Sequence, residues 1–132
     1  MTPTDLAPLL RDFYSERLAL LQRHVTSARG VSNYDVNNAY QYVIAREETH
    51  VYWVHRAILD VGATVPAASG DAGAPSGSER DLASADAAAN QAFVAKWTPK
   101  VAEVTHARHR KMLQVVLGEI DIQPRVGQGG AG

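Results

Sequence analysis

Residues 40–61 read YQYVIAREETHVYWVHRAILDV, and the interpretation of the whole chain depends on this stretch. Its apolar residues recur every three or four positions, which predicts a helix with one buried face. Glu47 and His50 are three residues apart, so a helix places both on that face, one turn apart. A carboxylate and an imidazole are costly to bury unless another group pairs with them. The stretch therefore predicts a buried polar site around Glu47 and His50.

The composition is that of one globular domain. The chain has 132 residues, enough for a hydrophobic core, and its 45% hydrophobic and 20% charged contents are ordinary for a soluble protein. A net charge of −1 points to neither nucleic acid nor membrane, and no apolar run approaches the ~20 residues of a membrane span. The absence of cysteines excludes thiolate metal sites. With no secretory signal pattern, we expect a cytoplasmic protein.

Two long helices are predicted in the first half of the chain. They cover residues 4–29 and 33–61, and each ends just before or at a glycine, Gly30 or Gly62. The connection between them is short, so the two helices are expected to be antiparallel neighbours.

Two further helices are predicted in the second half. A short third helix covers residues 79–96, and Thr98-Pro99 is the start signal for a fourth helix over residues 99–120. The alternative is one helix over about residues 80–118, kinked at Pro99.

Residues 62–78 are rich in Gly, Ala, Ser and Pro, which predicts a flexible crossover loop. When extended it could span roughly 55 Å, so it could return the chain to the other end of the bundle and make the second and third helices parallel. Residues 123–132 contain four glycines and are expected to form a disordered tail. The prediction is thus an all-α antiparallel four-helix bundle over residues 1–122, with a long crossover and a short third helix.

Glu16 is the next candidate for the buried site. It occupies the gap between Phe13 and Leu20 in the apolar series of the first helix, where residues recur at spacings of three and four. Counted from the turn near Val31, Glu16 is fifteen residues before and Glu47 sixteen residues after, so an antiparallel hairpin places them at the same height. The members of the series are Leu6, Leu9, Phe13, Leu20 and His24.

A second Glu-x-x-His pair, Glu103 and His106, falls in the predicted core stripe of the fourth helix. Asp86 is the acid in the predicted stripe of the third helix. The remaining histidines are expected at the surface or at helix ends, with contacts from His109 to the buried carboxylates as an alternative. These remaining histidines are His24, His55 and His109.

Three carboxylates and two imidazoles on the inner faces of one bundle require positive charge between them, which metal ions supply. Carboxylate oxygens with imidazole nitrogens suit iron or manganese and also accept zinc. Bridging carboxylates hold two ions close together. The predicted ligands are Glu16, Glu47, His50, Glu103 and His106.

The sequence resembles the ferritin-like di-iron carboxylate proteins, most of all their rubrerythrin branch, over about residues 5–120. Residues 44–50 (IAREETH), followed by Trp53-Val54 and residues 58–62 (ILDVG), resemble the second helix of that family. Residues 103–106 (EVTH) with Met112-Leu113 resemble its fourth helix. The family carries Glu, Glu-x-x-His, Glu and Glu-x-x-His on its four helices in turn, and five of these six roles fall on the predicted ligands. Asp86 is the candidate for the sixth role, with Glu48, water or a second chain as alternatives.

The resemblance implies a pair of iron ions that reacts with peroxide or O2, or that oxidises Fe(II) as a ferroxidase. No rubredoxin-like module is present, so a peroxidase would need an external electron donor. We expect a homodimer or higher oligomer to cover surface that the short third helix leaves open. The alternative function is a ferritin-like bundle whose metal site has been lost or repurposed, acting as a binding or assembly module.

Overall fold

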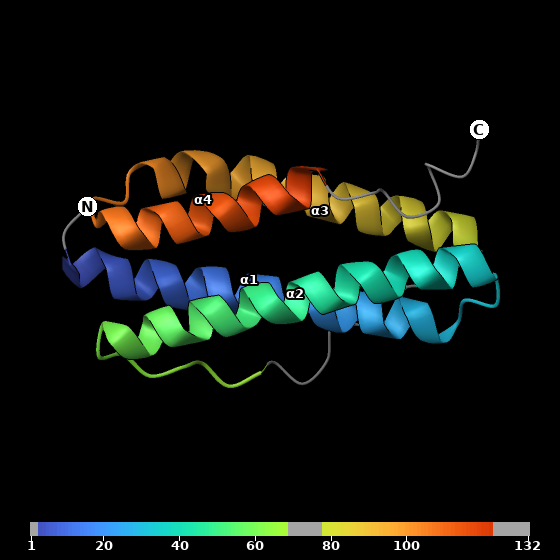
Figure 1. Ribbon diagram of the computed structural model, residues 1–132, viewed down its shortest axis with the longest axis horizontal. Helices are drawn as coiled ribbons and strands as arrows, with labels where there is room; N and C mark the ends of the chain where they lie inside the picture. Colours follow the sequence, from blue (N-terminus) through green and yellow to red (C-terminus); the bar gives the residue numbers. More distant parts are fainter. Residues whose placement is uncertain (1–2, 69–77, 123–132) are drawn as a thin grey trace.

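The structure, a computed structural model, describes residues 3–68 and 78–122, and these ranges contain four helices and no strand (Figure 1). The helices lie along one long axis; α1 contacts α2 and α3, and α4 contacts α3 and α2. The prediction of an all-helical chain with four helices is confirmed. The helices are α1 (Pro3–Arg29), α2 (Tyr34–Asp60), α3 (Glu79–Ala102) and α4 (Ala107–Ile122).

Helix α1 ends, and helix α2 begins and ends, within one residue of the predicted boundaries. Asn33 caps α2, because its side-chain oxygen accepts a hydrogen bond from the backbone N–H of Val36 at 3.0 Å. At the other end of α2, Gly62 adopts a φ of +77°, a conformation that L side chains rarely adopt. Figure 1 shows the chain reversing its direction between α1 and α2.

The predicted boundary between the third and fourth helices is wrong, and so is the alternative of one long helix. Helix α3 continues through Pro99 to Ala102, and the chain breaks at residues 103–106 before α4 begins. Val101 is fully buried, so the apolar stripe of α3 extends past Pro99, and this burial offsets the one backbone hydrogen bond that proline removes. The break is closed by hydrogen bonds from Glu103 N–H to Lys100 O and from the Arg110 guanidinium to Val104 O. The short helix is therefore α4, with 16 residues, and not α3, with 24.

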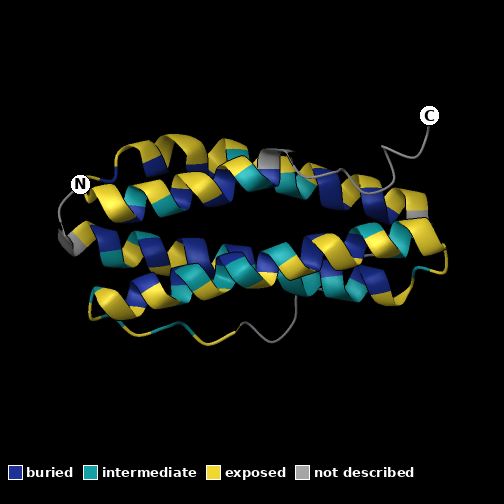
Figure 2. Cartoon of the chain, in the orientation of Figure 1, coloured by how far each residue is buried: buried dark blue, intermediate teal, exposed yellow. Residues whose placement is uncertain are grey.

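The buried apolar side chains form two clusters, one toward each end of the bundle (Figure 2). The larger cluster joins all four helices and includes Phe13, Ile58, Trp97 and Leu113. Among the described residues, the smaller one joins α1, α2 and α3 and is built around Tyr40. Along α1 and α2, buried polar residues separate the two clusters, and these are Arg17, His24, Glu47 and His50.

Two predictions concern segments that the structure describes only in part. Of the predicted crossover at residues 62–78, residues 69–77 lie outside the described residues, as does the whole predicted tail at residues 123–132. Over the ranges that are described, no helix is both long enough and apolar enough to cross a membrane.

Candidate functional site

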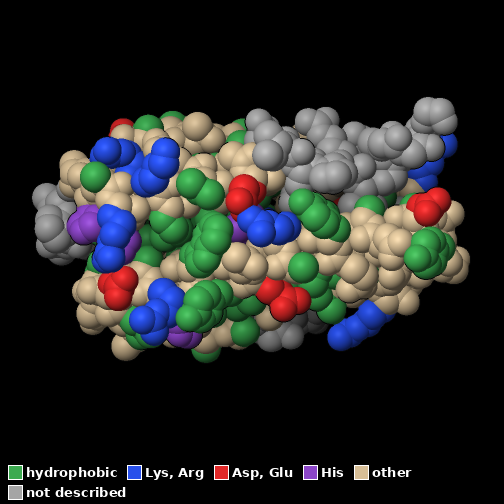
Figure 3. All heavy atoms as spheres, in the orientation of Figure 1, with side chains coloured by type: hydrophobic (Ala, Val, Ile, Leu, Met, Phe, Trp, Pro, Cys, Tyr) green, Lys and Arg blue, Asp and Glu red, His purple; other side chains and the backbone are tan. Residues whose placement is uncertain are grey.

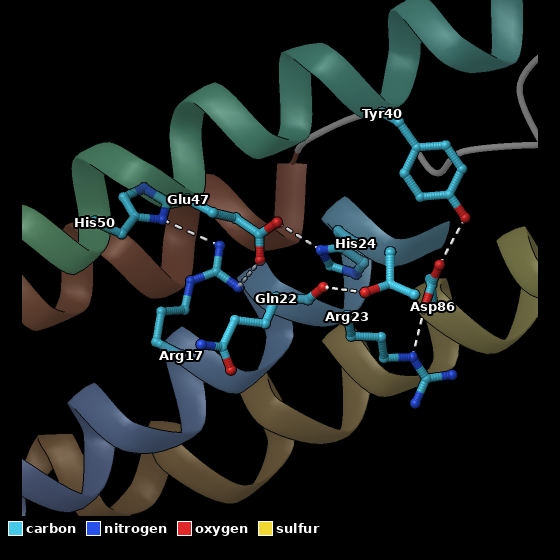
Figure 4. Close-up of polar contacts among 9 residues, drawn as sticks. Arg17, Gln22, Arg23, His24, Tyr40, Glu47, His50 and Asp86 are labelled. Carbon is cyan, nitrogen blue, oxygen red and sulfur yellow. Dashed lines mark hydrogen bonds and ion pairs between the residues drawn. The ribbon is translucent and has the colours of Figure 1, made fainter. Parts of the chain in front are cut away.

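Glu47 of α2 is the centre of a polar network inside the bundle (Figure 4). Its side chain is completely buried, as the helical period predicted. One carboxylate oxygen, Oε1, lies 2.5 Å from Nδ1 of His24, and the other, Oε2, lies 3.1 Å from Nη1 of Arg17. Both partners come from α1. Glu47 therefore has a cation on one side and an imidazole on the other.

Arg17 carries the positive charge of this network and is itself 0% exposed. Besides Glu47, its guanidinium reaches His50 at 3.2 Å and lies 5.6 Å from the ring centroid of Phe93 on α3. Burial lowers the pKa of Arg17, and the Glu47 carboxylate opposes that shift. A buried arginine beside a carboxylate remains protonated at neutral pH, because its ordinary pKa is above ~12. The interior thus holds a fixed charge pair.

His50 links this pair to the surface. Its Nδ1 faces the Arg17 guanidinium, which can only donate, so Nδ1 must accept and carry no proton. Its Nε2 then donates to Oε1 of Glu119 on α4 at 2.7 Å. Burial lowers the pKa of His50, and the charge of Arg17 lowers it further. The hydrogen bond to Glu119 raises this pKa but does not cancel the shift. Glu119 is 29% exposed, also pairs with Arg46, and has its pKa lowered by the hydrogen bond from His50.

Asp86 of α3 forms a second buried group beside this network (Figure 4). Its Oδ1 accepts from Nε of Arg23 on α1 at 2.5 Å, and its Oδ2 accepts from the Tyr40 hydroxyl of α2 at 2.6 Å. The same carboxylate thus joins three helices. Burial first, and then the bond to Asp86, raises the pKa of Tyr40. Asp86 is buried as an acid with two donors, rather than as a side chain open to a ligand.

Glu16 lies at the height that the hairpin predicted, but on the wrong side of α1. Its carboxylate bonds to Nζ of Lys96 at 2.6 Å and to Nε1 of Trp97 at 3.4 Å, both on α3. The next residue, Arg17, faces Glu47 instead. One residue along a helix turns the side chain by about 100°, which moves Glu16 from the interior to the seam between α1 and α3.

Glu103 and His106 lie in the connection between α3 and α4, and both are exposed. The prediction that they occupy the core stripe of a helix is wrong, because the chain leaves helical geometry at these residues. The ring of His106 lies against that of His109 in a tilted arrangement, with ring centroids 4.2 Å apart. Neither residue takes part in the network around Glu47 that the structure describes.

Three members of the network were not predicted, namely Arg17, His24 and Glu119. His24 was expected at the surface, yet it is buried, at 1% exposure. His109, which lies outside the network, was also expected at the surface and is 4% exposed. A charged residue such as Arg17 is rarely buried unless it is paired, so its type alone did not indicate the interior. The available signal for Arg17 was a second apolar series on α1. In this series Arg17, the partner of Glu47, takes the place that Glu16 has in the first series. The second series is Leu6, Leu10, Phe13, Arg17 and His24.

The arrangement does not fit a two-metal centre. Metal ligands need lone pairs that converge on one point, whereas Glu47 and His50 both direct an atom at the Arg17 guanidinium. An ion placed between them would lie against that guanidinium, and like charges repel. No group of three His, Asp or Glu side chains that could hold a metal ion occurs among the residues with described positions.

Comparison with known proteins does not assign the chain to a family. No family model, no curated protein and no solved structure matches it.

Proposed function

We propose that this chain is a ferritin-like bundle in which an arginine stands where the family holds metal, and that it acts as a binding module rather than as an oxidoreductase. The observation that carries the proposal is the position of Arg17, at 3.1 Å from Glu47 and 3.2 Å from His50. The guanidinium supplies the positive charge that the buried Glu47 needs. A metal ion is then not required to neutralise the interior.

The order of the helices supports the ferritin-like part of this proposal. Figure 1 draws α2 and α3 running in the same direction, and α1 and α4 in the opposite direction. Each contacting pair of helices is then antiparallel. A bundle with this arrangement requires a long connection between its second and third helices, as in ferritin-like folds. Residues 62–78 provide a connection of that kind.

The competing function is the di-iron reaction with peroxide, O2 or Fe(II). It shares Glu47 and His50 with our proposal but requires Arg17 to leave the space between them, and Glu103 and His106 to approach. The two functions therefore differ in iron content, which can be measured directly.

Iron uptake by the full chain tests the proposal. The protein is incubated with Fe(II) without oxygen, exposed to air, desalted and analysed for iron by mass spectrometry. We expect iron far below one ion per chain, at the same level in the wild type, in Glu47→Gln and in the exposed neighbour Glu48→Gln. About two ions per chain, lost in Glu47→Gln but kept in Glu48→Gln, would establish the di-iron function instead.

A further inference from the structure

A pocket of about 380 Å³ lies between the second half of α2 and the first half of α4. Its wall is apolar and is formed by Trp53 and Ala57 of α2 with Met112 and Val115 of α4. Ala57 belongs to the main core cluster, and Trp53 and Met112 pack against it. The volume falls within the range of small-molecule sites, roughly 300–1,000 Å³. We call this feature the α2/α4 pocket.

The charged groups of the α2/α4 pocket are mainly positive. Arg56 and Arg108 line it, and both are exposed. Asp60 is the one acid among the described residues of the wall, and it lies 3.5 Å from Arg108, so it neutralises one guanidinium at most. Burial, and then the charges of His106 and Arg108, lower the pKa of His109, so its ring is neutral at neutral pH. The balance is one unpaired positive charge beside an apolar wall.

The space-filling view shows the same combination on the face formed by α2 and α4. Hydrophobic side chains gather along the seam between the two helices, with basic side chains next to them (Figure 3). Val115 is 37% exposed, so part of the apolar wall is open to solvent. A ligand that covers this wall would remove apolar area from water, at roughly 25 cal/mol per Å².

We propose that the α2/α4 pocket binds an amphipathic monoanion, an aliphatic chain or ring system with one carboxylate or similar group. The apolar part lies on Trp53, Met112 and Val115, and the anionic group lies between Arg56 and Arg108. This proposal gives a ligand class to the binding module proposed above and rests on it in that respect. The pocket does not include Glu47 or His50, so the iron measurement and a pocket measurement can fail independently.

Octanoate and its neutral analogue 1-octanol test the proposal in the whole 132-residue chain. Trp53 lines the pocket, whereas Trp97 is buried in the core, so the two indole N–H resonances give a probe and an internal reference in one NMR titration. We expect octanoate to shift the Trp53 resonance saturably, to leave Trp97 in place, and to bind more tightly than 1-octanol.

Charge variants separate the two parts of the site. Arg56→Gln/Arg108→Gln should raise the octanoate Kd roughly fivefold to tenfold, as expected for losing two exposed ion pairs, and leave 1-octanol binding unchanged. Asp60→Asn should lower the octanoate Kd because it frees Arg108. Lys111→Gln, an exposed change on α4 outside the pocket, is the matched control and should alter neither ligand.

The proposal is overturned if octanoate produces no saturable shift of Trp53, or if octanoate and 1-octanol bind equally well. A Trp53 shift that follows protein concentration without added ligand would overturn it too, because a second copy of the chain would then occupy the pocket. Val115→Glu places a negative charge in the wall at a position that is 37% exposed, so we expect the variant to fold, which circular dichroism checks. It should abolish octanoate binding, and unchanged binding would contradict the assigned site.

Discussion

At the residue scale, a carboxylate in the middle of a helical bundle has to be neutralised, and here the cation is Arg17. Glu47 and Arg17 are both fully buried, so the free energy of their interaction is not reduced by exposure to water. Replacing such a pair together is often neutral, whereas removing one member leaves a buried charge without a partner. The stability of the fold should therefore fall when one member of the pair is replaced, and change little when both are replaced together.

The first prediction follows from this asymmetry. Arg17→Met keeps the unbranched stem of the side chain but removes the guanidinium that compensates Glu47, and should lower the free energy of unfolding by about 3–5 kcal/mol in urea denaturation. Arg17→Met/Glu47→Gln should recover a large part of this loss, because neither of the two positions then carries a charge. Arg11→Met, an exposed change on the same helix, should stay within about 0.5 kcal/mol of the wild type. An equally small effect of Arg17→Met would contradict the account.

The second prediction concerns pH. The folded state holds His50 neutral, with its pKa lowered, while the unfolded chain has the ordinary value of about 6.5. Between these values the unfolded chain binds more protons, so stability is complete above pH ~6.5 and falls as the pH drops toward the lowered pKa. The lowered pKa of Glu119 acts with the same sign in more acidic solution.

Urea denaturation at about pH 7.5 and about pH 5.5 measures this difference. The wild type should be more stable at the higher pH, and His50→Gln should show a smaller difference because glutamine does not titrate. His109 has a lowered pKa as well, so a residual difference of the same sign should remain in that variant. Greater stability at the lower pH would contradict the assigned protonation of His50.

The burial of Glu47 and His50 could be predicted from the sequence, because the apolar residues around them fix the inner face of α2. The residue of α1 that pairs with Glu47 could not be predicted in this way. Two series on α1 alternate spacings of three and four, one through Leu9 and Glu16 and the other through Leu10 and Arg17. The hydropathy of the two series is similar, because each contains one charged residue, so hydropathy does not indicate which series is buried. Only the packing of α1 against α2 and α3 together selects Arg17.

At the scale of the elements, Asp86 fixes α3 to the α1/α2 hairpin. The third prediction is that Tyr40→Phe removes one of its two donors and lowers the free energy of unfolding by about 1–3 kcal/mol, the cost of leaving a buried polar group without a partner. Tyr42→Phe is the matched control, since Tyr42 lies on the same helix and is 57% exposed. Equal effects of the two variants in urea denaturation would show that the bond to Asp86 contributes nothing.

The helix boundaries that depend on local signals were predicted well, and the one that depends on packing was not. Gly30, Asn33 and Gly62 act through their own backbone and side-chain preferences, so α1 and α2 end close to the predicted residues. Pro99 is a strong local signal for a new helix, but α3 continues past it to Ala102, and Val101 in this last turn is fully buried. The Glu103-His106 motif was assigned to a helix for the same reason, and its role in a metal site depended on that assignment.

At the scale of the whole molecule, the polar network lies between two apolar clusters of unequal size. The larger cluster is closed by four helices, while α4 contributes no residue to the smaller one in the described part of the chain. The charges of Arg17 and Glu47 lie between these clusters. In the ferritin-like bundle that we propose, they stand in place of the metal ions. We propose that this region holds no metal ion, because the Arg17 guanidinium contacts both Glu47 and His50 there.

Anomalous X-ray diffraction at the iron edge, from crystals grown with Fe(II) in the absence of oxygen, shows whether iron occupies this region. We predict guanidinium density for Arg17, 3.1 Å from Glu47 and 3.2 Å from His50, with no anomalous peak between these two residues. An anomalous peak between Glu47 and His50, with the Arg17 side chain displaced from them, would contradict the account and support the di-iron function.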